Sequence, residues 1–309
     1  MNASEIRFRL KPLMLPVAML LGVLFHNYMG YVAFISPYLI FMMLLVTYCK
    51  INPGSFVVNR FVWSLLSVQV LGAAAVYVLI LPAGAELAQG AFICVFCPTA
   101  TAAPVVTGML GGSVGLLASY SIVSNAAVAV LAPVLFSFMG IGVEMPVREA
   151  MTAIGAKVFP LILAPLAIAF LMKVFVPKLH GSVARHQSLS FYMWAFALII
   201  VVGNAVSFIM SEPVGKVPIM LAIAAVSLFT CCAQFAIGRI IGGRFGNKIS
   251  GAQGLGQKNT VLAIWMALTY LDPVASVGPA SYVAWQNIIN SIQLYLKTKR
   301  DASLKQMRR

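Results

Sequence analysis

The stretch ISGAQGLGQKNTVLAIWMAL, residues 249–268, is apolar and long enough to cross a membrane, but its composition interrupts the helix. Gly251, Gly254 and Gly256 weaken a helix just before Lys258. The Asn-Thr pair that follows the lysine is a good start for a second helix. The segment therefore predicts a broken membrane helix with a lysine at the break.

A second apolar stretch, FICVFCPTATAAPVVTGMLGG at residues 92–112, carries two prolines in its middle. Pro98 and Pro104 each remove a backbone donor and clash with the preceding turn, so we expect the helix to break between them. Thr99 and Thr101 lie in this gap, where their hydroxyls can satisfy backbone groups that the break leaves free.

The whole chain has the composition of a membrane protein. Of its 309 residues, 61% are hydrophobic and only 9% are charged, and its mean hydropathy is +0.96. The apolar runs are continuous rather than alternating, which favours helices over strands. We predict an all-α integral membrane protein with ten transmembrane helices. They lie at about 12–29, 31–49, 61–82, 86–111, 113–140, 152–176, 187–210, 216–242, 250–271 and 274–296.

The two interrupted spans are the fourth and the ninth, so each is the fourth of a set of five. This pairing is typical of a transporter built from two inverted five-helix repeats, here about 12–140 and 152–296. The broken helices would cross near the membrane midplane and point the positive ends of their half-helices into a binding site. We expect one transmembrane domain, 1–296, followed by a basic tail, 297–309.

The basic residues indicate the orientation of the chain. With the N-terminus in the cytoplasm, 17 Lys and Arg residues fall on the cytoplasmic side and three on the outer side, with Lys258 in neither group. This bias predicts that both termini are cytoplasmic, in what we expect to be a bacterial inner membrane. The net charge of +14 then favours contact of the tail with anionic lipid rather than nucleic acid. The sequence leaves the oligomeric state open.

No catalytic constellation appears in the sequence, so we do not expect an enzyme. The histidines lie near helix ends, and no cluster of His, Asp and Glu offers a metal site or calls for a cofactor. Cys94 and Cys97 have the spacing of a redox pair, but small buried residues are the simpler interpretation.

Several segments resemble the bile acid:sodium symporter family. CPTATAAPVVTGMLGGSVGLLASYSIVSNAAVAVLAPVL, residues 97–135, resembles that family's fourth and fifth helices. GQKNTVLAIWMAL, residues 256–268, resembles its Gly-x-Gln-Asn-Ser-x-Leu-Ala segment, and PYLIFMMLLVTYCKINPGSF, residues 37–56, resembles its second helix. Length, number of spans and the positions of both broken helices agree as well.

The resemblance implies a panel domain and a core domain, with an organic anion bound beside the crossed helices. The family's substrate-binding threonine and asparagine correspond to Thr101 and Asn259, and we add Thr99 and Thr260 as candidates beside them. Members of the family carry bile acids, pantothenate-like acids and small keto acids, typically with two sodium ions.

This sequence departs from the family at the sodium sites. The family's Ser-Asn pair is Ala103-Pro104 here, its shared glutamate falls at Gly254, and the glutamine that follows falls at Lys258. The coupling-ion region otherwise keeps only the hydroxyls of the fifth helix and one glutamine of the third, namely Ser121, Ser124 and Gln69.

Sodium, a hard cation, prefers several oxygen ligands, including a carboxylate. A lysine and a sodium ion 4 Å apart would repel by about 4 kcal/mol at an effective dielectric constant of 20. We therefore expect sodium-independent transport of an organic anion, with Lys258 supplying the charge that sodium supplies in relatives. The alternative for Lys258 is that its side chain extends to the cytoplasmic interface without a specific role.

Other functions stay open at this stage. A buried lysine can exchange a proton, so transport can be proton-coupled or uncoupled. The chain can also be a conventional sodium symporter, or a sensor that binds its ligand without moving it. An arsenite transporter with the same fold is the runner-up for substrate, because Cys97 lies in the broken helix.

Overall fold

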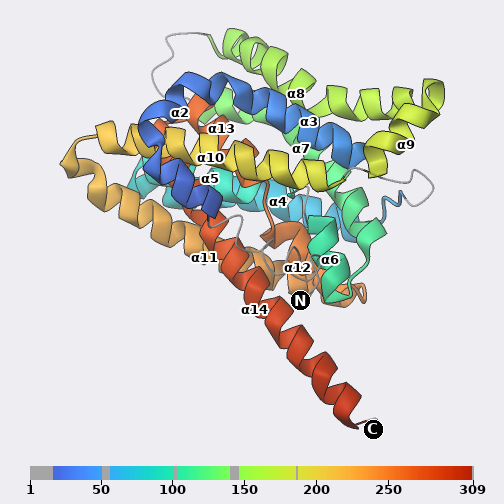
Figure 1. The fold of residues 1–309 in the computed structure, drawn as a ribbon. Helices are drawn as coiled ribbons and strands as arrows, with labels where there is room; N and C mark the ends of the chain where they lie inside the picture. Colours follow the sequence, from blue (N-terminus) through green and yellow to red (C-terminus); the bar gives the residue numbers. More distant parts are fainter. Residues whose placement is uncertain (1–16, 51–55, 101–102, 140–145, 186, 308–309) are drawn as a thin grey trace.

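The structure, a computed structural model, describes residues 17–50, 56–100, 103–139, 146–185 and 187–307. Within these ranges every regular element is a helix, and one isolated antiparallel bridge joins two of the connections (Figure 1). The predicted all-α class is therefore confirmed. Thr101 lies outside the described residues.

The helices differ greatly in length. A helix at residues 17–24 comes first. It is followed by α2 (His26–Val32), α3 (Ser36–Lys50), α4 (Arg60–Ile80), α5 (Ala85–Phe96), α6 (Ala103–Leu110), α7 (Val114–Met139), α8 (Val147–Phe175), α9 (Pro177–Arg185), α10 (Gln187–Ser211), α11 (Val217–Arg244), α12 (Lys248–Gly256), α13 (Thr260–Tyr270) and α14 (Val277–Met307). Short 3₁₀ turns extend or join them at η1 (Ala33–Ile35), η3 (Leu81–Ala83), η4 (Val214–Lys216) and η5 (Pro273–Ser276).

Six helical segments in the described part of the chain are long and apolar enough to span a membrane. They are His26–Lys50, Arg60–Ala83, Val114–Met139, Val147–Phe175, Tyr192–Ser211 and Val214–Arg244. The fourth and ninth predicted spans are each divided into two short helices, and α14 carries amide side chains along its apolar part. The full number of ten spans stays a prediction.

The first helices are interrupted on both sides of the expected boundary near residue 30, at Phe25 and at Val32, where φ is −109° and ψ is 2°. The helix is interrupted at Phe25, whose φ of −103° and ψ of 19° are not helical, and it then continues through α2 and η1 into α3. The segment from residues 22 to 32 lies close against α10, and a Cβ atom on Gly22 would lie 2.7 Å from the Ile199 carbonyl oxygen. Tight packing of this segment, rather than a turn residue, therefore decides where the helix bends.

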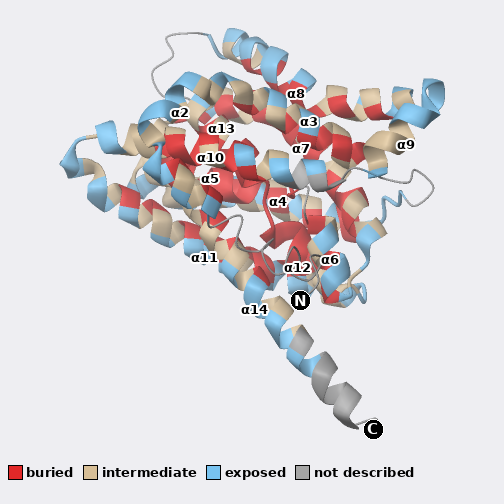
Figure 2. Cartoon of the chain, in the orientation of Figure 1, coloured by how far each residue is buried: buried red, intermediate tan, exposed pale blue. Residues whose placement is uncertain are grey.

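The helices pack in two groups. One group contains α2, α3, α8, α9 and α10, and the other contains α4 to α7 together with α11 to α14 (Figure 1). The groups meet along α7 and α8, which pack extensively against each other, and where α13 packs against α3 and α10. Both broken helices belong to the second group, and its buried residues concentrate around α5 and α12 (Figure 2).

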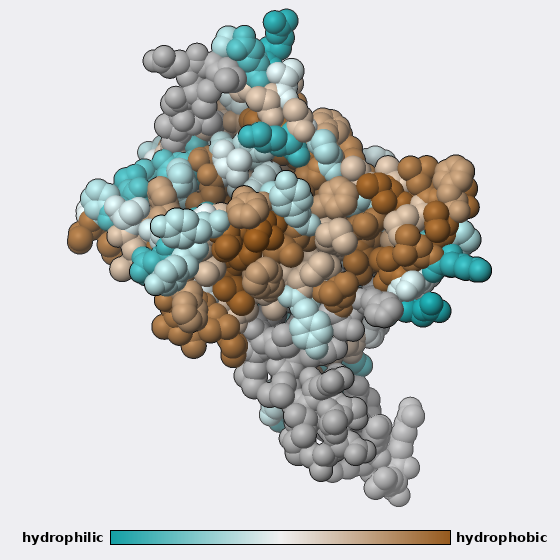
Figure 3. Space-filling view, turned by 45° about the horizontal axis from the view of Figure 1, so that its top comes forward, coloured by the Kyte–Doolittle hydropathy of each residue, from teal (hydrophilic) through white to brown (hydrophobic). Residues whose placement is uncertain are grey.

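Large apolar side chains cover much of the surface. Leu79, Phe138 and Phe229 are 78%, 70% and 74% exposed, and the view in Figure 3 shows a broad area of hydrophobic side chains with hydrophilic groups toward its edges. A soluble monomer rarely exposes contiguous apolar area of this size. Together with the apolar helices, this surface identifies an integral membrane protein.

Glycines allow α12 to pack directly on the backbone of α11. A Cβ atom on Gly238 would collide with the carbonyl group of Gly251, and a Cβ atom on Gly251 would collide with Gly238 and Gly242. All three residues have ordinary helical backbones. The contact therefore requires their small size and not their conformational freedom. This close approach sets the position of the second broken helix.

Candidate functional site at the crossing of the two broken helices

The first broken helix is interrupted where the prolines predict. Helix α5 ends at Phe96 and α6 begins at Ala103. Pro98 lies in the gap, and Pro104 lies in the first turn of α6, where proline is tolerated because the N–H group has no helical partner there. The predicted break between the two prolines is confirmed.

The second broken helix is interrupted at the lysine. Helix α12 ends at Gly256 and α13 begins at Thr260. Asn259 is the N-cap of α13, and its Oδ1 accepts a hydrogen bond from the Leu262 N–H at 3.3 Å. The expected restart of the helix at the Asn-Thr pair is confirmed.

The two breaks lie against each other and pair through their backbones. Thr99 and Lys258 form an antiparallel bridge. The Ala100 N–H donates to the Gln257 carbonyl oxygen at 2.9 Å, and the Asn259 N–H donates to the Pro98 carbonyl oxygen at 2.8 Å. Each interruption thus satisfies backbone groups of the other, which is how irregular backbone becomes tolerable among apolar helices.

The carbonyl oxygens at the end of α5 have no partners within the helix and are bonded by side chains instead. Three side chains remote in sequence donate to three consecutive oxygens: Gln234 Nε2 to Cys94 O at 3.1 Å, Lys258 Nζ to Val95 O at 2.8 Å, and Gln69 Nε2 to Phe96 O at 2.7 Å. The C-terminal end of α5 is therefore capped entirely from outside its own segment.

Lys258 is buried in the crossing, with 1% of its surface exposed. No other charged residue in the described part of the chain is buried to this degree. Its Nζ bonds Val95 O, and its backbone N–H donates to Gln286 Oε1 at 2.8 Å. A positive group at the C-terminal end of a helix is favourable because the helix dipole is negative there. The alternative in which this side chain extends to the membrane interface is wrong.

Gln69 is the centre of a closed hydrogen-bond network beside the crossing. Its Oε1 accepts from Tyr120 Oη at 2.7 Å and from Ser124 Oγ at 2.8 Å, while its Nε2 donates to Phe96 O. Ser121, the other candidate of the coupling-ion region, is buried one turn earlier on α7. Two of the three residues expected to remain from a sodium site, Gln69 and Ser124, thus bond protein groups.

Gly254 is closely surrounded by side chains. A Cβ atom there would lie 3.1 Å from Leu65 Cδ1 and 3.1 Å from Tyr120 Cδ1, which is closer than ordinary contact. The Gly254 carbonyl oxygen accepts a hydrogen bond from Thr99 Oγ1 at 2.8 Å. A larger side chain at this position would require Leu65 and Tyr120 to shift.

The candidate substrate-binding residues are divided in their roles. The Thr99 hydroxyl donates a hydrogen bond from the first broken helix to the Gly254 carbonyl oxygen of the second. Asn259 Nδ2 and Thr260 Oγ1 are buried and have no hydrogen-bond partner in the described structure. Both belong to the first residues of α13, at the positive end of its dipole. They are hydrogen-bond donors available to an anion that reaches this end of the helix.

Two residues of α14 that are not among the sequence-based candidates also stabilise the crossing. Tyr282 Oη donates to the Gly256 carbonyl oxygen at 2.9 Å, which caps α12 as Gln69 caps α5. Gln286, a polar residue within a span, bonds the backbone of Lys258. Polar side chains in an apolar helix indicate a buried hydrogen bond. Their partners lie 26 and 28 residues away in sequence, so a local pattern does not identify them.

The cysteines and metal-ligating groups offer no further site. Cys94 and Cys97 are both buried free thiols, and Cys97 Sγ donates to the Asn259 carbonyl oxygen at 3.1 Å. Among the residues that the structure describes, no three His, Cys, Asp or Glu side chains lie close enough to hold a metal ion. The thiol of the broken helix is therefore a structural donor.

Comparison with protein-family models finds no match, and comparison with curated proteins finds none. The resemblance to the bile acid:sodium symporter family thus rests on the quoted segments. What the fold and the surface identify is an all-helical integral membrane protein with two short-helix pairs that cross at their breaks.

Proposed function

We propose that this protein is a secondary transporter of an organic anion that works without sodium, with Lys258 in the place of a bound cation. The observation that carries the proposal is the position of the Lys258 ammonium group, 2.8 Å from the Val95 carbonyl oxygen inside the crossing. A cation there balances the negative end of α5, which a bound sodium ion would otherwise do.

The surroundings of Lys258 support the absence of sodium. No carboxylate side chain is buried among the described residues, and a Cβ atom on Gly254 would press against Leu65 and Tyr120. The remaining oxygens of Gln69 and Ser124 bond each other. A sodium ion brought next to the lysine would therefore meet repulsion without a compensating negative ligand.

An anionic substrate suits the start of α13. The Asn259 amide and the Thr260 hydroxyl are unpartnered there, and the helix dipole adds positive potential. Both residues are buried, so binding requires the two groups of helices to separate at this point. The organic anion would be of the bile acid, pantothenate-like or keto acid type.

The packing in two groups supports alternating access. In the proposed mechanism, the group with α2, α3, α8, α9 and α10 is the panel domain, and the group with both broken helices is the core domain. Two inverted five-helix repeats with ten spans and cytoplasmic termini are part of the same proposal.

The first test needs no knowledge of the substrate. We expect the melting temperature of the purified protein to be the same in sodium chloride and potassium chloride at equal ionic strength. Lys258→Gln is expected to gain a sodium-specific rise of about 2 °C or more, because an ion that binds only the folded state stabilises it. If sodium stabilises the unmodified protein over potassium, the chain is instead a conventional sodium symporter.

The second test separates a transporter from a sensor on the same fold. Proteoliposomes are offered radiolabelled taurocholate, pantothenate and pyruvate, each in sodium and in potassium buffer and at two internal pH values. We expect uptake of at least one of these anions at equal rates in both cation buffers, and a loss of about tenfold or more in Asn259→Ala, because a donor to a buried anion is removed. Dependence on the pH gradient would add proton coupling. Binding of an anion without uptake would identify a sensor.

A further inference from the structure

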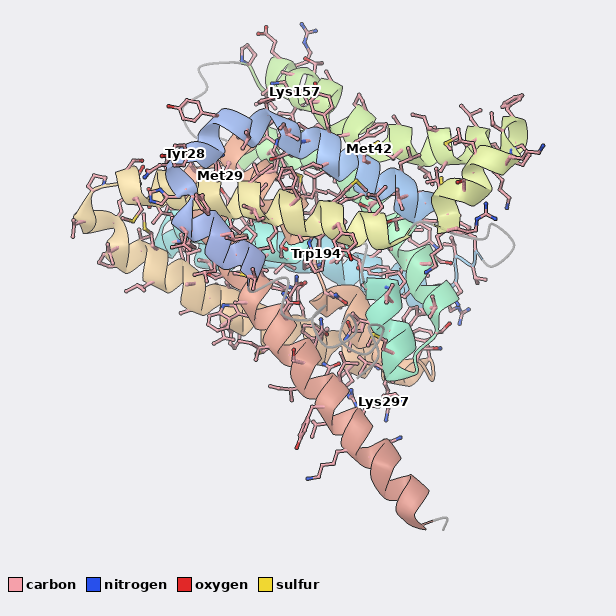
Figure 4. All side chains as sticks on the ribbon, viewed as in Figure 1. Tyr28, Met29, Met42, Lys157, Trp194 and Lys297 are labelled. Atoms are coloured by element: carbon pink, nitrogen blue, oxygen red, sulfur yellow. The ribbon has the colours of Figure 1, made fainter. Side chains whose placement is uncertain are left out.

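A basic cavity lies at the end of the core where α6, α11, α12 and α14 meet. Its volume is about 240 Å³. It is lined by Leu110, Arg239, Ile249, Gln293, Leu296, Lys297 and Arg300. Figure 4 labels Lys297 on α14, where this helix leaves the body of the protein. A cavity of this size is smaller than the sites of drug-sized ligands, about 300–1,000 Å³, and suits a small group.

The charge of this cavity is of one sign. Three of the seven lining residues are basic and none is acidic. In the described structure, the ion pairs join Lys216 to Glu86 and Glu212, and none involves Arg239 or Arg300. Arginine guanidinium groups bond phosphate oxygens in pairs, so two of them facing one small cavity favour a phosphate group.

Two of the acidic side chains that the structure describes, Glu86 and Asp272, lie toward the opposite ends of the broken helices. Glu86 is in the first turn of α5, whereas the cavity is at the end of α6. Asp272 follows α13, whereas the cavity is beside the start of α12. The positive potential at the cavity is therefore not neutralised by these two carboxylates.

Apolar side chains share the cavity with the arginines. Leu110, Ile249 and Leu296 line it, and Leu296 is 56% exposed. Ile292 and Tyr295, on the turn of α14 before it, are 53% and 66% exposed. A ligand with a phosphate group and acyl chains would place its charge on the arginines and its chains along this part of α14.

The cavity also joins parts of the core that carry the crossing. Ser250, near the start of α12, bonds the Ser113 N–H at 2.9 Å in the link between α6 and α7. A Cβ atom on Gly111, at the end of α6, would lie 3.7 Å from Lys297 Nζ. A group bound in the cavity therefore contacts both broken helices and α14 at once.

We propose that this cavity binds the phosphate of an anionic phospholipid, such as phosphatidylglycerol, through Arg239 and Arg300. Bound there, the lipid holds α14 against α6 and α12. It stabilises the ends of the two broken helices that lie away from the crossing, which are the end of α6 and the start of α12. Basic pockets between transmembrane helices are a recurrent form of headgroup recognition. The site is separate from the start of α13 and does not depend on the transport proposal.

The test is lipid binding to the full-length protein in detergent, measured by native mass spectrometry and by melting temperature. Phosphatidylglycerol is added to the unmodified protein, to Arg239→Gln, to Arg300→Gln and to Arg185→Gln. Arg185 is the matched control, because it is an exposed arginine at the end of α9, outside the cavity. We expect one retained lipid, about fivefold weaker in each cavity variant and unchanged in Arg185→Gln.

Two other ligands test whether the cavity prefers an anionic lipid over a neutral lipid or free phosphate. Phosphatidylcholine, which has the same phosphate but no net charge, is expected to be retained at least fivefold less well. Inorganic phosphate at equal concentration is expected to raise the melting temperature far less, because it lacks acyl chains. Equal retention of phosphatidylcholine, an equal effect of inorganic phosphate, or an equal loss in Arg185→Gln would each overturn the proposal.

Discussion

Replacing Gln69 by leucine is expected to destabilise the protein by about 3 kcal/mol. The substitution keeps a side chain of similar size on α4 but removes four hydrogen bonds at once, including a longer one from Gln69 Nε2 to Cys97 O at 3.3 Å. It leaves Phe96 O without its donor, and Tyr120 Oη and Ser124 Oγ without their acceptor. An unpartnered buried polar group costs about 1–3 kcal/mol, and these three groups are all buried beside the crossing. Chemical or thermal unfolding in detergent measures the effect.

A graded series separates the network from the loss of a side chain. Tyr120→Phe removes one of the four bonds and leaves Gln69 bonded to Ser124, Phe96 and Cys97, so we expect a loss of about 1 kcal/mol. Ser124→Ala should lose a similar amount. If Gln69→Leu loses no more free energy of unfolding than the single-bond variants, the cap on α5 does not stabilise the fold. This description of the crossing would then be wrong.

Replacing Gly238 by alanine is expected to lower stability by about 2–3 kcal/mol, although alanine is the better helix former. The added Cβ atom would meet the Gly251 carbonyl group and the Ala252 Cα at 3.1 Å. Both are backbone atoms, which cannot rotate away as a side chain can. Helix α12 must therefore move off α11, and Lys258 moves with it. Thermal unfolding measures the loss, and sodium dependence of the variant reports any change at the crossing.

The matched control for this prediction is Gly181→Ala in α9. Gly181 is also a helical glycine, but nothing lies within 4 Å of a Cβ atom built there. Alanine at such a position should be neutral or should stabilise by up to about 1 kcal/mol. Equal effects at Gly238 and Gly181 would mean that helix propensity, not the contact between α11 and α12, determines the result.

The sequence predicts the broken helices because their causes are local. Pro98 and Pro104 cannot continue an α-helix, and the glycines before Lys258 weaken one, so both interruptions follow from single residues and their neighbours. The Asn259 cap likewise depends on a side chain bonding three residues ahead. The interruptions at Phe25 and Val32, on either side of the boundary predicted near residue 30, have no such local signal.

The candidate site, too, is only partly predictable from local sequence. A lone lysine between two apolar stretches marks Lys258 as a functional candidate from sequence alone. The partner of its ammonium group is Val95 O, 163 residues away, and no local pattern encodes that distance. The sequence predicts Gln69 as a remnant ion ligand, yet in the structure its side chain bonds four protein groups, which leaves its amide fully used.

By itself, the sequence determined that the chain is a helical membrane protein with two interrupted apolar helices, since hydropathy and helix breaking act over a few turns. Only the tertiary structure decided that the two interruptions pair, that side chains from other segments cap the end of α5, and that Gly254 is enclosed by Leu65 and Tyr120. The reason is physical: a carbonyl oxygen freed by a break must find a donor, but which donor reaches it depends on how distant helices pack.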